Sequence, residues 1–184
     1  VVESGPLTAS GEGWQAAAAR LLAALRREPG GAAGAYDLWL EAGDLALPGL
    51  PGTIPLVRLD ARLTLGAALD RTLDGPPPLL ALDLREARVQ QGPASLTASG
   101  ALAPDAQGVL EGEVTLVLQD WRAMLDLAEA AGLLGEASRV PFEGALDALA
   151  AGGDRIELPV TFADGWVSAL GLALVEAPRL PQRQ

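Results

Sequence analysis

The chain has 184 residues, of which 49% are apolar and only 4% are aromatic, and its formal net charge at pH 7 is −11. A chain of this size can bury a hydrophobic core without disulfides or structural metals, and its acidity disfavours binding to nucleic acids or anionic lipid headgroups. Because Cys, His and Lys are absent, we expect no metal, no cofactor, no thiolate or imidazole catalysis and no Schiff base.

The first 30 residues predict a short strand followed by a helix. The strand covers residues 6–9. Ser10 is placed to cap a helix in which Trp14, Leu21 and Leu25 share one face, and a Pro-Gly-Gly run ends that helix.

The middle of the chain alternates between apolar and polar residues, which predicts half-exposed strands. The predicted strands are residues 36–47, 57–65, 80–85, 96–102 and 109–118. The last three are expected to form a meander. Turns are expected at residues 48–52 and 74–78, and a brief helical turn at residues 66–73.

Two helices are predicted after these strands. Asp120 can cap the first helix, which buries Trp121 and Met124 on one face. The second is expected to start at Pro141 and to end before residues 152–153, where two glycines follow each other.

The chain is expected to finish on a hairpin and an extended tail. Residues 156–162 and 166–175 form its strands, joined by a turn that contains Asp164-Gly165. Pro159 favours an edge strand, because proline donates no ladder hydrogen bond.

These elements predict a single α+β domain over residues 1–184. Its twisted, mainly antiparallel sheet would be covered on one face by the amphipathic helices near Trp14 and Trp121, since alternating strands need one buried face.

Three groups of segments carry a family resemblance. They are residues 96–102 with 108–114, residues 121–125 with 132–134, and residues 158–165 running on to 170–172 and 178–180. In order and spacing they resemble the C-terminal part of the bacterial family catalogued as domain of unknown function 2125. More distantly, the strand-turn-strand cadence and the Asp-Trp helix start resemble AsmA-type envelope proteins.

The resemblance implies a location and a context. It implies an uncharacterised envelope protein, anchored in the inner membrane through a segment upstream of Val1, with this domain on the periplasmic side. AsmA-type proteins are associated with lipid handling. No catalytic residue set is implied.

The acidic residues and tryptophans are the candidate functional groups. Glycosidase-type carboxylate pairs are conceivable for Asp83 with Glu86 and for Glu111 with Glu113, but solvated carboxylates are the favoured interpretation. A Gly-Glu-Gly run at residues 11–13 is interpreted as a helix start rather than an anion-binding loop.

The four tryptophans fall into two pairs. Trp14 and Trp121 are predicted to be core residues because they lie on apolar helix faces. Trp39 and Trp166 are predicted to face a ligand or partner.

The leading functional hypothesis is a non-enzymatic envelope accessory domain that binds a partner protein. The alternative is an AsmA-like lipid-binding channel lined by Leu, Val and Ala, and the third choice is a carboxylate-based hydrolase. The partner hypothesis is preferred, because a chain this short leaves little sheet to span a lipid once helices have covered part of it.

Overall fold

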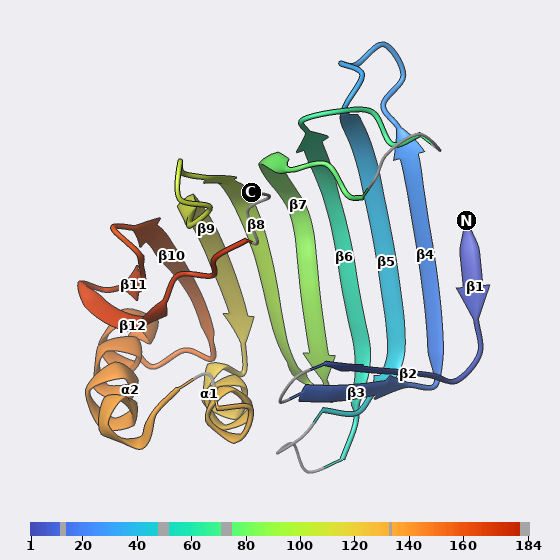
Figure 1. The fold of residues 1–184 in the computed structure, drawn as a ribbon. Helices are drawn as coiled ribbons and strands as arrows, with labels where there is room; N and C mark the ends of the chain where they lie inside the picture. The colour runs from blue at the N-terminus through green and yellow to red at the C-terminus, as the bar shows by residue number, and fades with distance from the viewer. Residues whose placement is uncertain (12–13, 48–51, 71–74, 133, 181–184) are drawn as a thin grey trace.

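The structure is a computed structural model that describes residues 1–11, 14–47, 52–70, 75–132 and 134–180. Among these residues, ten strands form one antiparallel sheet in the order β1-β4-β5-β6-β7-β8-β9-β10-β11-β12. Figure 1 shows this sheet as a broad meander in which, from β4 onward, each strand lies beside the next strand of the chain. The α+β class and the antiparallel sheet are therefore confirmed.

The strands have the following bounds. They are β1 (Val2–Ser4), β4 (Arg20–Arg27), β5 (Ala35–Leu45), β6 (Ile54–Leu65), β7 (Leu79–Gln91), β8 (Ala94–Pro104), β9 (Leu110–Gln119), β10 (Arg155–Ala163), β11 (Trp166–Ala169) and β12 (Leu172–Glu176). A separate hairpin consists of β2 (Leu7–Gly11) and β3 (Trp14–Ala18) and joins β5 through a bridge between Ala17 and Ala46.

The predicted helix over residues 10–27 is wrong, because these residues form the end of β2, all of β3 and all of β4. Ala, Leu and Arg are good helix formers, but intrinsic propensity is a weak prior. All eight residues of β4 pair with β5, which provides backbone hydrogen bonds along one edge of β4. This pairing places Leu21, Ala23 and Leu25 on one side of the sheet. Trp14 therefore lies on a strand and not on a helix.

Helices α1 (Trp121–Ala130) and α2 (Glu136–Ala150) connect β9 to β10 and pack on one side of the sheet. Their most extensive contacts with the sheet lie on β8, β9 and β10, and Val167 and Ala169 of β11 belong to the same core. Pro141 falls inside α2 rather than at its start. The helices thus lie over one end of the sheet, and no helix of the described residues lies near Trp14, so the predicted cover of one face by helices near Trp14 and Trp121 is not seen.

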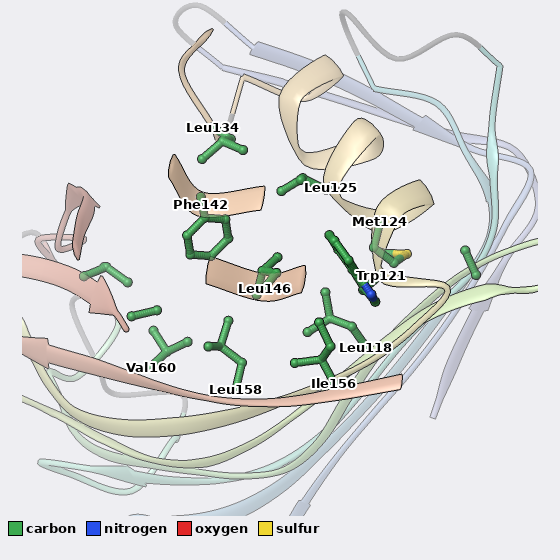
Figure 2. Packing of buried hydrophobic residues seen from close by; sticks show 13 residues of the cluster. Leu118, Trp121, Met124, Leu125, Leu134, Phe142, Leu146, Ile156, Leu158 and Val160 are labelled. Carbon is green, nitrogen blue, oxygen red and sulfur yellow. The ribbon is translucent and has the colours of Figure 1, made fainter. Parts of the chain in front are cut away.

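The main core lies between these helices and the strands beneath them (Figure 2). Trp121 and Leu146 are fully buried there, and the Trp121 Nε1–H donates to the Gly153 carbonyl at 3.3 Å. In Figure 2 both side chains point toward Leu118, Ile156 and Leu158 of the sheet. The prediction that Trp121 is a core residue is confirmed.

The C-terminal hairpin contains one more turn than predicted. Asp164 and Gly165 have positive φ and form the expected turn, but Leu170 and Gly171 are also left-handed, so residues 166–175 split into β11 and β12. A leucine with positive φ is uncommon, which is why the second turn was missed. β10 lies inside the sheet, and Pro159 precedes the first residue of β10 that pairs with β11.

Two further predictions concern loops. Residues 66–70 contain no helix, and residues 71–74 lie outside the described part of the chain, as do residues 48–51 of the predicted turn. Of the Gly-Glu-Gly run, Gly11 ends β2 and pairs with Trp14, whereas the other two residues are not described.

Candidate functional site

The alternation of each strand divides the sheet into an apolar face and a polar face. Across the middle of the sheet, cross-strand neighbours run from Leu40 to Leu59, Ala87, Ala98 and Leu116. The same side continues into Leu158, which packs under the helices. The helices therefore lie on the apolar face, and they cover only part of it.

A second buried cluster marks the apolar face beyond the helices. Its buried members are Ala61, Leu84, Ala98, Leu102 and Val114, all of which come from β6, β7, β8 and β9. The hydrophobic residues packed against this cluster are also strand residues. Figure 2 shows strands bending toward the side that carries the helices, and this curvature lets strand side chains bury one another.

We call the part of this face formed by β4–β7 the open apolar face. Its residues are Leu21, Ala23, Leu25, Leu38, Leu40, Val57, Leu59, Ala61, Leu63, Leu82, Leu84 and Ala87. Most are half-buried, Leu25 is 47% exposed, and Ala61 at the centre is fully buried. The β2–β3 hairpin lies at the end of this face, where Ala17 meets Ala46.

The open apolar face consists mainly of Leu, Val and Ala. Tyr36 lies at its margin, buried opposite Leu63, and its hydroxyl accepts a hydrogen bond from the Leu69 N–H at 2.7 Å. Such a surface forms no hydrogen bonds with a ligand, so binding there depends on burial of aliphatic area. A ligand with polar groups at this position loses their hydration without compensation.

The polar face of the same strands carries a network of arginines and carboxylates. Asp37 is its centre: Arg26 lies 3.2 Å and Arg85 lies 2.9 Å from its oxygens. A second centre is Glu41, which pairs with Arg20 at 2.8 Å and with Arg58 at 2.9 Å. These pairs join β4, β5, β6 and β7 across the sheet.

The network shifts the pKa of two of its members. The hydrogen bond from Arg26 lowers the pKa of Asp37 and, together with Arg85, outweighs the effect of partial burial. Desolvation opposes the charge of Arg85, but the hydrogen bond to Asp37 and the nearby Asp60 raise the pKa of Arg85. Both groups are therefore held in their charged forms.

Trp39 lies on the polar face, half-buried, between the two centres of this network. It lines a pocket of about 530 Å³. The other lining residues are Val1, Ala24, Leu25, Arg26, Asp37, Leu38, Asp60 and Arg85. Each of the four charged lining residues has an ion-pair partner. These charges therefore link neighbouring strands of the sheet.

Trp166 lies far from Trp39 in the sheet, on β11 rather than β5. It is 47% exposed, and it is followed by exposed Leu170 in the turn and by exposed Leu172 and Val175 in β12. The structure therefore does not bring Trp39 and Trp166 into one site. Whether either faces a ligand or partner stays a prediction.

The proposed carboxylate pairs lie on strands. Asp83 is exposed on β7, and a register shift after Leu84 separates it from half-buried Glu86. Glu111 and Glu113 are exposed on β9. Within the described ranges, no group of three or more acidic residues is placed to hold a metal ion, and no helix has the length and apolar character needed to traverse a membrane.

The ion-pair network was not predicted from the sequence. Arg58, Asp60 and Arg62 alternate with apolar residues, so their common face was predictable. Their partners depend on the register of β4, β5 and β7, which the sequence does not specify.

Comparison with known proteins identifies one family. A family model described as "Uncharacterized protein conserved in bacteria (DUF2125)" matches residues 1–178. No curated protein and no solved structure matches the chain. The expected family is confirmed, and since the match covers nearly the whole chain, it does not single out a C-terminal part.

Proposed function

This chain belongs to the bacterial DUF2125 family, whose description names no activity, and we propose from the geometry that its open apolar face binds the acyl chain of a lipid. The observation that carries the proposal is the second buried cluster. It is built from strand residues, and at its β6 end half-buried leucines of β5 and β6 lie next to Ala61. An aliphatic chain bound on this face would bury the apolar side chains of β4–β7, as α1 and α2 bury those of β8–β10.

The size of the face fits an acyl chain. Neighbouring strands lie about 4.8 Å apart, so the three intervals from β4 to β7 span roughly 14 Å. That width is comparable to the extended hydrocarbon chain of a common membrane lipid, which occupies about half of a bilayer core of about 30 Å. The sheet is therefore wide enough, against the earlier expectation that little of it remains uncovered.

The composition of the face favours a lipid over a protein partner. Protein interfaces concentrate their binding energy in Trp, Tyr and Arg. The open apolar face consists mainly of Leu, Val and Ala, its Tyr36 is buried, and the Arg side chains of β6 lie on the polar face. The hypothesis of a partner protein stays a second proposal, carried by the exposed residues around Trp166.

Titration with the fluorescent fatty acid cis-parinaric acid tests the proposal. We expect saturable binding to the wild-type protein and binding at least about tenfold weaker to Leu59→Gln, because a buried unpaired amide costs about 1–3 kcal/mol. Leu56→Gln is the matched control, since Leu56 is also a half-buried leucine of β6 but points to the polar face. Equal binding to the two variants, or none to the wild type, refutes the proposal.

We also propose the envelope location that the family resemblance implies. A lipid-binding face is useful where lipid chains leave or enter a membrane. A reporter fused after Gln184 in the full-length protein tests this location, because a reporter that is active only in the periplasm then becomes active. Activity of a cytoplasmic reporter in the same position contradicts it.

A further inference from the structure

The outer edge of the sheet at β12 is the strongest unassigned feature of the described residues. β12 is the last strand of the sheet and pairs on one side with β11. On its other side, no backbone hydrogen bond is formed to any part of the chain that the structure describes. A strand with one unpaired edge is a template for another extended strand.

The side chains at this edge are unusually apolar for an exposed strand. Leu172 is 37% and Val175 is 39% exposed, and Trp166 and Leu170 beside them are also exposed. From Leu172 to Val175 the strand carries no charge. Charged or proline residues within an edge strand normally prevent pairing with other chains.

The opposite edge of the sheet, at β1 and β4, differs from β12 in strand length and in charge. β1 has only three residues and pairs with Leu21–Ala23, so the rest of β4 is left beside solvent. That remaining stretch carries Arg26 and Arg27, which are both exposed. A three-residue strand and two cations protect this edge. β12 has five residues, its one charge lies at its last residue, Glu176, and one register shift interrupts its pairing with β11.

We infer that β12 pairs antiparallel with β12 of a second copy of this chain, joining two sheets about a two-fold axis. If the antiparallel pair is centred on Ala173, Glu176 of one copy lies opposite Leu170 of the other. If it is centred on Leu174, Glu176 lies opposite Leu172. In both registers the uncharged residues of the two strands pair with each other. No carboxylate then faces its own copy. Pairing of β12 with the protected β1 edge would instead produce an open filament, whereas the two-fold arrangement closes at a dimer.

This inference is independent of acyl-chain binding. The open apolar face lies on β4–β7, at the other end of the sheet from β12. A dimer through β12 leaves that face as it is in the single chain, so failure of one proposal does not decide the other.

Sedimentation velocity over a range of protein concentrations tests the dimer. We expect the wild type to sediment as a dimer and Leu172→Lys to dissociate at concentrations at least about tenfold higher, because a lysine on an edge strand opposes pairing. Leu80→Lys is the matched control: Leu80 is an exposed leucine of β7, which lies in the middle of the sheet and not at this edge, and its variant stays dimeric.

Three outcomes overturn the inference: a monomeric wild type at every concentration, a Leu172→Lys dimer as tight as the wild type, or a wild type that grows into filaments. If Leu172→Lys loses the far-ultraviolet spectrum of the fold, Val175→Lys replaces it, since Val175 is equally exposed on the same strand. Dissociation of a folded Val175→Lys protein then supports the inference, and its persistence as a dimer refutes it.

Discussion

The two halves of this sheet use the same alternation of residues but complete their apolar faces differently. Over β8–β10, helices α1 and α2 bury the face and enclose Trp121 and Leu146 completely. Over β4–β7, the same face consists mostly of half-buried Leu and Val around fully buried Ala61. The first half is a conventional core, and the second has the chemistry of a core whose other side is supplied by a ligand.

The largest expected difference between the halves is in stability. Leu146→Ala should lower the free energy of unfolding by about 3–5 kcal/mol, because it leaves a cavity in a closed core. Leu59→Ala on the open apolar face should lower it by only about 1–2 kcal/mol, since the side chain is half exposed. Urea unfolding of ligand-free protein measures both values, and equal losses would show that the two halves are packed alike.

The junction between the halves gives a smaller effect. Gly100 on β8 has a φ of +155°, and a Cβ added there would collide with the backbone of Glu113 and Val114 on β9. We expect Gly100→Ala to destabilise the protein by about 2–3 kcal/mol through clash and strain. Gly92→Ala is the control, because Gly92 also has positive φ but a Cβ there meets no neighbouring atom. Urea unfolding measures both variants, and Gly92→Ala should cost less, because it brings no clash and a φ of +59° is one that other residues can adopt.

The smallest effect concerns the polar face of the open half and its response to acid. The pKa of Asp37 lies below its usual value of 3.8. Above that value Asp37 is charged whether folded or unfolded, and its contribution to stability is complete. As the pH falls below 3.8, the unfolded chain takes up the proton first, so this contribution is lost as the pH approaches the folded pKa.

Asp37→Asn therefore should reduce the slope of stability against pH in this acidic range. The control is Asp83→Asn, which neutralises an exposed carboxylate on β7. Urea unfolding at a series of pH values measures both slopes. If Asp37→Asn leaves the slope of stability against pH unchanged, the ion pairs of Asp37 do not contribute to stability as described.

The sequence was informative where alternation was clean and uninformative where composition was ambiguous. In β6, Arg58, Asp60 and Arg62 alternate with apolar residues, so the strand and its two faces were predictable. Around Leu21 the apolar residues are consecutive and rich in alanine, which fits a helix as well as a strand. The choice between them is made by pairing with β5, a contact remote in sequence.

The candidate sites show the same division. A channel lined by Leu, Val and Ala was among the hypotheses, because the chain has many aliphatic residues and few aromatics. Its extent was not predictable, because a single wrong helix near Trp14 covered it in the predicted fold. The ion pairs of Asp37 require the register of four strands, and the exposed edge at β12 requires the left-handed turn at Leu170.

The most direct test of the open apolar face is the lipid that the protein carries from its host. Mass spectrometry of organic extracts from protein purified without detergent should find acyl lipid in about equimolar amount with the wild type and with Leu56→Gln. The lipid should be strongly depleted in folded Leu59→Gln. Clean extracts from the wild type, or equal lipid in the two variants, would contradict the account.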